Sequence, residues 1–229
     1  TVIRDGENPN INFKDPEAKQ YCINNWDANG DLELSLDEAN TITSLPRCNE
    51  DIESFRELLL FGSLKDVEDE AFAGYAKLQD ILLPSSLERV GDFSFANTNI
   101  TGISLPQSVA SIGNGAFAGC TKLISFSGAY ASLDGKLLVD DTKLMAYAPA
   151  GLTTFEVPQN ITDIQPGTFS GGVLSSFKGK YATYNGDSLI VDGTLVAILP
   201  NVSKYTVTTT VQTVAPHVFK YSDVTDISF

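Results

Sequence analysis

Oxygen-bearing side chains recur at alternate positions in the acidic segment 27–38, and this arrangement suits a hard cation. The candidate metal ligands are Asp27, Asn29, Asp31, Glu33 and Glu38. Calcium takes roughly six to eight oxygen ligands, and this spacing delivers them. We expect Glu33 to contribute its backbone carbonyl and Glu38 to bind through both carboxylate oxygens. The segment therefore predicts a Ca2+ site.

The segment has the oxygen spacing of an EF-hand loop but departs from that template at its sixth position. Leu32 stands there in place of Gly, and a non-Gly residue at positive φ costs on the order of 1–2 kcal/mol. Leu34, at the eighth position, is expected to pair as a very short strand. In the alternative interpretation this is an acidic turn that feeds a helix, with a capping box from Ser35 to Glu38. The two interpretations are compatible, because an EF-hand loop also ends by starting its exit helix.

A helix is expected directly before this loop. Asp15 suits the N-cap position and Pro16 the first helical position, and Cys22 and Trp26 follow at helical spacing. We therefore expect residues 1–50 to form a small α-helical, EF-hand-like module. The same module is expected to cap the N-terminal end of the repeats that follow, where an open apolar coil would otherwise meet water.

The rest of the chain repeats one apolar pattern around a recurring phenylalanine. Apolar residues lie eight and five positions before each anchor, and again five or six and eight or nine positions after it. The anchors are Phe72, Phe95, Phe117, Phe169 and Phe219. Successive anchors are 23, 22, 52 and 50 residues apart, and a unit of 22–23 residues falls in the leucine-rich-repeat range. One unit cannot bury its own apolar face, so the pattern predicts a solenoid in which each Phe rests on its counterpart in the next coil.

Short strands are expected in the apolar segments that follow the anchors, for example 77–83 and 122–126. Neighbouring strands would pair in parallel, about 4.8 Å apart. Pro84, Pro106 and Pro158 each lie eleven residues before an anchor. Because proline lacks a backbone donor, we expect these residues to end strands and turn the chain.

Two of the units, LPSSLERVGDFSF at 83–95 and LPQSVASIGNGAF at 105–117, carry a family signature. They resemble BspA-type leucine-rich repeats of bacterial surface proteins, and the resemblance extends over residues 51–229. It implies a leucine-rich-repeat solenoid over that range and an adhesion-type role, the role being an analogy drawn from fold. A calcium-loop-like stretch ahead of the repeats also resembles bacterial members of this family.

The two long anchor intervals hold inserts near 128–157 and 179–207 that resemble each other. With a one-residue slip, DGKLLVDDTKLMAYAP at 134–149 aligns with NGDSLIVDGTLVAILP at 185–200. Asp-Gly at 192–193, between apolar runs, is a strong hairpin signal. The inserts are therefore predicted to be β-hairpins that widen a coil.

The composition is acidic, and the acidity is concentrated near the N-terminus. The chain has 29 Asp and Glu against 15 Lys and Arg, a net charge of −14, and 18 of the acids lie in residues 1–80. The absence of a basic stripe argues against nucleic acid and anionic membranes. No apolar run approaches the roughly 20 residues that a membrane span needs. No signal peptide is present, as in a mature exported protein or a recombinant fragment. We expect a secreted or cell-surface bacterial protein, and a lipid anchor added through a removed leader is compatible with this.

The three cysteines are an odd number. Cys120 follows an anchor Phe and is expected to lie in the core as a small apolar residue. Cys22 and Cys48 both belong to the N-terminal module. The sequence leaves open whether they form a disulfide.

Catalytic machinery is not indicated by the sequence. The single histidine, His217, lies two residues before an anchor and is expected to be a surface or packing residue. Asp140 and Asp141 are adjacent in a predicted turn and are expected to be solvated, since catalytic carboxylates must converge across a cleft. Phosphate-loop, nucleophile and His/Cys metal motifs are absent. We therefore expect a non-catalytic protein.

Tyrosines cluster in or near the inserts, and Tyr147 and Tyr184 are the candidate ligand contacts. Such tyrosines either pack within a hairpin or form a contact surface for protein or sugar. The leading hypothesis is an adhesion module that recognises host protein or glycan through the solenoid face. The alternatives are a structural spacer without a ligand and a non-catalytic domain of a glycan-degrading assembly.

Overall fold

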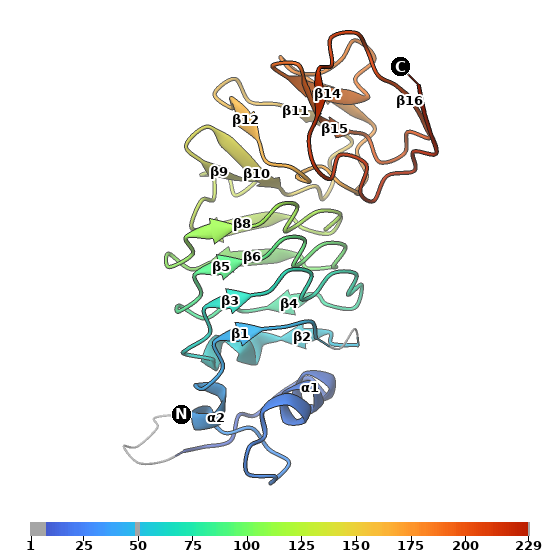
Figure 1. Ribbon diagram of the computed structural model, residues 1–229. Helices are drawn as coiled ribbons and strands as arrows, with labels where there is room; N and C mark the ends of the chain where they lie inside the picture. Colours follow the sequence, from blue (N-terminus) through green and yellow to red (C-terminus); the bar gives the residue numbers. More distant parts are fainter. Residues whose placement is uncertain (1–7, 49–50, 229) are drawn as a thin grey trace.

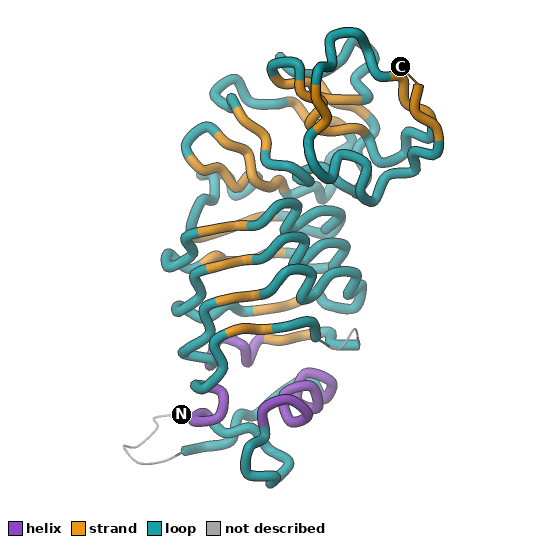
Figure 2. The backbone as a smooth tube through the Cα atoms, in the orientation of Figure 1, coloured by secondary structure: helices purple, strands orange, loops and turns teal. Residues whose placement is uncertain are grey.

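The computed structural model describes residues 8–48 and 51–228 of the chain. Figure 1 shows a stack of coils that runs from a small N-terminal module to the C-terminal end. Most of the stack consists of short strands joined by loops, and helix is confined to the N-terminal end (Figure 2). The solenoid predicted from the repeat is therefore confirmed.

One ladder of parallel strands is built from the apolar residues that lie five positions before each anchor. Its first sheet has the strand order β1-β3-β5-β7. These strands are β1 (Ser44–Leu45), β3 (Asp66–Val67), β5 (Arg89–Val90) and β7 (Ser111–Ile112). β12 (Asp163–Ile164) and β17 (Thr213–Val214) occupy the same position in later coils. The apolar member of most of these strands points into the core.

A second parallel ladder contains the apolar residues that lie eight or nine positions after each anchor, together with Phe55, Phe155 and Tyr205, which pair with them. Its strands pair as β2 with β4, β6 with β8, β11 with β13, and β16 with β18. Their bounds are β2 (Ser54–Phe55), β4 (Asp80–Ile81), β6 (Gly102–Leu105), β8 (Ser125–Gly128), β11 (Thr154–Glu156), β13 (Ser176–Lys178), β16 (Lys204–Thr206) and β18 (Asp226–Ser228). The strands expected at 77–83 and 122–126 exist, although β4 is shorter and β8 begins later.

The anchor phenylalanines of the first coils stack directly on one another. The Phe72 and Phe95 ring centroids are 5.2 Å apart, and those of Phe95 and Phe117 are 5.5 Å apart with an interplanar angle of 2°. These separations are close to the roughly 4.8 Å spacing of paired strands. Backbone N–H groups of one anchor loop also donate to carbonyls of the next, as from Phe72 to Ser94 at 2.7 Å.

The prolines lie at turns, as expected. The carbonyls of Pro84, Pro106 and Pro158 each accept a hydrogen bond, 3.1 Å long, from the N–H group three residues later. Proline thus ends the second-ladder segment and begins the turn toward the first ladder.

The predicted hairpins in both inserts are confirmed. β9 (Leu137–Asp140) pairs antiparallel with β10 (Lys143–Tyr147), and β14 (Ser188–Val191) pairs antiparallel with β15 (Thr194–Ile198). The second strand of each hairpin also pairs in parallel with the next coil, β10 with β12 and β15 with β17. The inserts are therefore integral parts of the first ladder.

Stacking of anchors does not continue past the first insert. Phe169 contacts Tyr147 of β10 and Phe155 of β11, with centroid distances of 4.9 Å for both pairs. Phe219 in the last coil is only partly buried. The expectation that every anchor rests on its counterpart is wrong for these two, because each hairpin strand brings its own side chains between successive anchors.

The N-terminal module shares one apolar core with the first coils. Helix α1 (Pro16–Trp26) places Trp26 against Phe61 at 6.1 Å, and Phe13 contacts Phe55 at 6.4 Å. Phe61 follows the 3-10 helix η1 (Arg56–Leu60). Ile11, Ala18, Cys22 and Leu34 belong to the same buried cluster as Leu45, Phe55 and Leu58. The module therefore covers the apolar end of the solenoid.

A pair of full helices, as in an EF-hand unit, is not shown in the described part of this module. Helix α2 (Leu36–Ala39) has four residues and ends at Asn40. The following segment, Thr41–Thr43, is rich in β-branched residues, which favour the extended chain that enters β1. The boundary expected between residues 50 and 51 adjoins residues 49–50, which lie outside the described residues.

Asp15 joins the helix to the solenoid. One carboxylate oxygen accepts hydrogen bonds from the N–H groups of Glu17 and Ala18, as the predicted N-cap should. The other accepts from Glu53 at 2.7 Å and from Ser54, the first residue of β2, at 2.8 Å. Burial by itself raises the pKa of Asp15, but these four backbone donors together lower it below its ordinary value.

Phe95→Ala should lower the free energy of unfolding by about 3–5 kcal/mol, because the ring is fully buried between two stacked neighbours. Urea denaturation followed by circular dichroism measures this change. Phe219→Ala is the matched control at a partly buried anchor and should cost clearly less. Equal costs for the two variants would contradict the stacking account.

Asp15→Ala should destabilise the chain by about 0.5–2 kcal/mol at neutral pH, since it removes a helix cap. Because the folded pKa is lowered, the carboxylate contribution is complete above its ordinary pKa of 3.8 and is lost as the pH falls through the folded value. The stability difference between wild type and variant should therefore shrink on acidification. Unfolding titrations from neutral to acidic pH test this, with the exposed Asp163→Ala as control. A difference that is constant over the whole range would count against the proposed contacts.

Candidate functional site

The loop at 27–38 holds its acidic side chains against its own backbone. Asp27 accepts hydrogen bonds from the N–H of Gly30 at 2.7 Å and of Leu32 at 2.9 Å. Leu32 adopts φ 64°, the left-handed conformation for which the template uses glycine, and its side chain is exposed. The expected strain at the sixth position is thus present, and the loop keeps the turn despite it.

The next two candidate ligands follow the same pattern. The side-chain oxygen of Asn29 accepts from the Asp31 N–H at 2.8 Å, and Asp31 accepts from the Glu33 N–H at 2.9 Å. The Glu33 carboxylate instead pairs with Lys19 of α1 at 2.6 Å. This pairing is compatible with the prediction that Glu33 would offer its backbone carbonyl to an ion.

Glu38 forms the capping box that the alternative interpretation predicts. Its carboxylate accepts from the N–H and hydroxyl of Ser35, which lower its pKa, and from the N–H of Ala28 at 3.0 Å. Leu34 is fully buried, and its carbonyl accepts from Ile11 N–H at 2.7 Å. The neighbouring Ser35 forms an isolated antiparallel bridge with Asn10 in place of the short strand expected at Leu34. Across residues 8–48 and 51–228, no three Asp, Glu, His or Cys side chains form a metal-binding group. The Ca2+ site therefore remains a prediction.

The second insert carries an open groove of about 580 Å³, which we call the insert groove. It is lined by residues from 180–190 and 205–210. Tyr184, in the turn before β14, is fully exposed, and Tyr205 on β16 is a buried residue of the lining. A volume in the range of about 300–1,000 Å³ is usual for small-molecule sites.

Polar groups in the insert groove are held in a fixed chain of hydrogen bonds. The hydroxyl of Tyr205 donates to Ser188 Oγ at 3.0 Å, and Ser188 donates to Asp187 Oδ1 at 2.9 Å. Thr183 also donates to Asp187 Oδ1 at 2.9 Å, and Asn185 donates to Asp187 Oδ2 at 2.5 Å. Both carboxylate oxygens are thereby oriented, so the groove presents Asp187 in one position.

The two candidate tyrosines have different environments. Tyr184 is exposed, as a ligand contact requires, whereas Tyr147 is 6% exposed and packs on Phe155 and Phe169. Burial also raises the pKa of Tyr147. The interpretation of Tyr147 as a ligand contact is wrong, because β10 directs it into the core between two coils.

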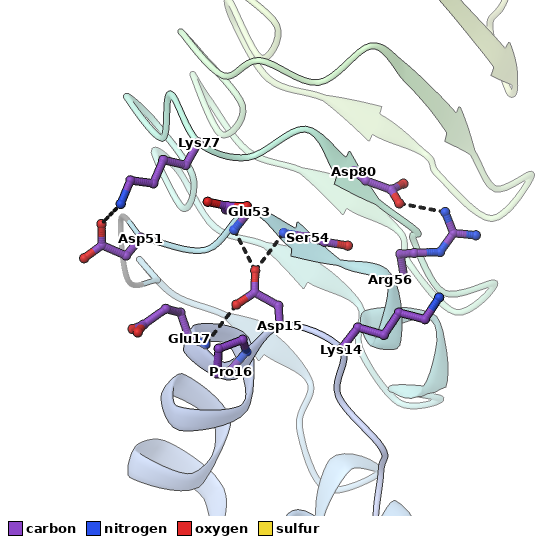
Figure 3. Close-up of a pocket in the computed structure, with 10 residues that line it drawn as sticks. All are labelled: Lys14, Asp15, Pro16, Glu17, Asp51, Glu53, Ser54, Arg56, Lys77 and Asp80. Atoms are coloured by element: carbon purple, nitrogen blue, oxygen red, sulfur yellow. Dashed lines mark hydrogen bonds and ion pairs between the residues drawn. The ribbon is translucent and has the colours of Figure 1, made fainter.

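A second groove, of about 680 Å³, lies where the N-terminal module meets the solenoid (Figure 3). Four of its charged side chains form ion pairs within the chain: Arg56 pairs with Asp80 at 2.7 Å and Lys77 with Asp51 at 2.6 Å. Asp15 lies at its floor in the contacts described above. These interactions hold the module against the first coils, so we interpret this groove as structural.

His217 and the acidic turn show no catalytic arrangement. The imidazole ring packs edge-on against Phe93 at a centroid distance of 5.0 Å, and the backbone carbonyl of His217 accepts from the Ser170 hydroxyl. His217 is thus a packing residue at the solenoid surface. Asp140 and Asp141 are exposed at the first hairpin turn.

All three cysteines are free thiols in this structure. Cys120 is fully buried in the core, as expected, and burial raises its pKa to about 11. Burial likewise raises the pKa of Cys22, and that of Cys48 to about 12. Thiols with raised pKa values are poor nucleophiles at neutral pH.

Most of the insert groove was not predicted from the sequence. Asp187, Ser188 and Tyr205 come from different strands and loops, and no motif links them. The one sequence feature that could have indicated the groove is a difference between the aligned inserts. Asp187 and Ser188 of the second insert align with Lys136 and Leu137 of the first.

Several solved structures have a similar arrangement of repeats. A leucine rich cell surface protein from Faecalibacterium prausnitzii A2-165 is 15% identical, with a TM-score of 0.43, and the match covers 76% of this chain and 62% of that one. A leucine-rich repeat protein from Eubacterium ventriosum ATCC 27560 is 17% identical, with a TM-score of 0.42 and coverage of 84% and 61%. The pneumococcal vaccine antigen PcpA is 19% identical, with a TM-score of 0.35 and coverage of 73% and 46%. The chain thus spans less than two thirds of the length of these proteins.

No curated protein matches the chain. Within the described residues, no helix has the length and apolar character needed to cross a membrane.

The family model for the BspA type leucine rich repeat region matches residues 47–175 in six copies, which is more than half of the chain. Both ladders continue beyond the matched region, where β17 pairs with β15 and β18 with β16. BspA-type leucine-rich repeat proteins are typically bacterial surface or secreted proteins. The repeats, the paired ladders and the family match agree that this chain belongs to the BspA-type leucine-rich repeat family.

Proposed function

We propose that the chain is a non-catalytic adhesion module of a bacterial protein and that it binds an extracellular protein or glycan through the insert groove. The observation that carries this proposal is the fully exposed Tyr184 beside a fixed polar network around Asp187. Exposed Tyr residues often dominate binding energy, because they offer a large amphipathic surface at little cost in conformational entropy.

Comparison of the two inserts favours recognition over a purely structural role. Leu133 and Tyr184 occupy equivalent turn positions before the first hairpin strand and are both fully exposed. In the first insert Ser132 donates to Asp134 at 2.6 Å, so a turn of this kind forms without the network around Asp187. In the second insert Asn185 and Asp187 line the groove and are not buried, so they can be reached by a ligand. A spacer without a ligand, and a non-catalytic domain of a glycan-degrading assembly, are the alternatives.

The location that fits this role is the bacterial surface or the surrounding medium. The family match supports such a location. Attachment through a lipid on a removed leader is part of the proposal, and mass spectrometry of the protein isolated from its native cells would test it.

We also propose that the loop at 27–38 binds Ca2+ through Asp27, Asn29, Asp31, Glu38 and the carbonyl of Glu33. Two observations support this. The loop already holds Leu32 in the left-handed turn, and three oxygen-bearing side chains line the turn from alternate residues. Coordination of Ca2+ by the Glu38 carboxylate would compete with the hydrogen bonds that this carboxylate accepts from Ser35. Ca2+ binding should therefore alter the N-terminal end of α2.

The adhesion proposal predicts saturable capture of the purified chain on some member of a panel of extracellular matrix proteins and glycans. Tyr184→Ala should weaken capture at least about tenfold, as expected of a central binding residue. Leu133→Ala, at the equivalent exposed position of the first insert, should leave capture unchanged. If a folded sample is captured by nothing on the panel, or if both variants bind like wild type, the proposed use of the insert groove is wrong.

The Ca2+ proposal predicts saturable uptake by calorimetry and a rise in melting temperature. Free Ca2+ at about 100 times the dissociation constant should stabilise the folded chain by about 2.7 kcal/mol. Asp27→Ala should abolish both effects, whereas Asp37→Ala, an exposed acid outside the ligand set, should retain them. Unchanged melting in excess chelator, together with no heat of binding at millimolar Ca2+, would refute it.

A further inference from the structure

The insert groove has a chemical character that narrows the class of its ligand. We infer that it takes a neutral oligosaccharide, an inference that rests on the binding function proposed above. The argument depends on three properties of the lining: its charge, its density of hydroxyl groups and its single exposed aromatic ring.

The charge of the lining is balanced and already engaged. Its ionisable side chains apart from the tyrosines are Lys180 and Asp187. The Lys180 ammonium lies 4.6 Å from the centre of the Tyr181 ring and donates to the Gln159 carbonyl at 3.0 Å. Asp187 accepts from three side chains. A polyanionic ligand would find only the Lys180 ammonium, which already has a partner, and would be repelled by Asp187. A basic peptide would find only the Asp187 carboxylate, which already accepts three hydrogen bonds. The lining therefore favours neither an anionic nor a cationic ligand.

Hydroxyl groups dominate the rest of the lining. The lining includes Thr183, Thr206, Thr208 and Thr210, with Thr208 and Thr210 in hydrogen-bond contact at 2.8 Å, whereas Ser188 is fully buried and holds Asp187 in place. Hydroxyls both donate and accept, and Asp187 and Asn185 add an oriented acceptor and an amide. Sugar hydroxyls also donate and accept, so they can pair with such a lining. An apolar protein side chain would leave these groups unsatisfied, at a cost of about 1–3 kcal/mol for each buried group.

Tyr184 supplies the apolar component that a sugar also requires. One face of a pyranose ring presents C–H groups, and an aromatic ring offers a flat surface of matching size with a polar hydroxyl at its edge. Tyr184 is fully exposed at the rim of the groove, so its ring is free to meet such a face. The structurally equivalent first insert has Leu133, Lys136, Leu137 and Phe155 at the positions of Tyr184, Asp187, Ser188 and Tyr205. It therefore lacks this combination within the same backbone framework.

The test is calorimetric titration of the whole chain with defined neutral oligosaccharides, namely gluco-, manno-, galacto- and xylo-series, alongside sulfated and uronic-acid oligosaccharides. We expect saturable binding of at least one neutral series. Tyr184→Ala and Asp187→Asn should each weaken it at least about tenfold. Leu133→Ala and Asp134→Asn, in the first insert, should change it less than about twofold, and circular dichroism should show all four variants folded.

Each remaining outcome overturns the inference. Binding confined to the acidic oligosaccharides would show that the ligand is charged. Equal losses of affinity in the variants of the first and second inserts would show that the sugar binds outside the insert groove. No binding of any oligosaccharide, together with Tyr184-dependent capture of a protein on the panel described above, would refute the sugar ligand and leave the adhesion function standing. Absence of both would refute the two proposals together.

Discussion

Each coil of this protein must bury its apolar edge against another coil, and the rest of the structure follows from that requirement. Phe95 makes the point, because its ring is fully buried only while Phe72 and Phe117 lie on either side of it. Ion pairs also join the coils, as between Lys65 and Glu88, but exposed pairs contribute only about 0–1 kcal/mol each. Stacked rings and the backbone ladders therefore supply most of the cohesion.

The same requirement explains the N-terminal module. A first coil without a neighbour would expose its apolar end, and α1 covers it with Trp26 while Asp15 satisfies backbone donors of both the helix and β2. The loop at 27–38 is thus attached to a segment whose position depends on the solenoid. Any stabilisation of that loop by an ion would be transmitted to the capped end of the stack.

Inserts interrupt the stacking without breaking the ladder. β10 and β15 each pair with the following coil, so a hairpin adds surface while the parallel register continues. Tyr147 packs on Phe169 in the first insert, and Ile198 takes the equivalent position in the second. At the turn before the hairpin, the second insert exposes Tyr184 where the first has Leu133, and it adds a polar network around Asp187. The solenoid thus provides a rigid support, and differences between two similar hairpins provide the chemistry.

The sequence by itself determined the repeat, the hairpins, the Asp15 cap and the capping box at Ser35, because each is a short-range pattern of residue types. It also located the apolar positions of both ladders, although only the second was expected as strands. The tertiary structure decided which tyrosine faces solvent, since Tyr147 lies on a strand that the next coil covers and Tyr184 lies in a turn that no other coil in the described part of the chain covers. It also placed Tyr205 beneath Asp187 and brought His217, Lys220 and Tyr221 of the last coil against Phe93. Such contacts depend on the relative orientation of distant coils. That orientation is set by all the coils between them, so no single segment of the sequence predicts it.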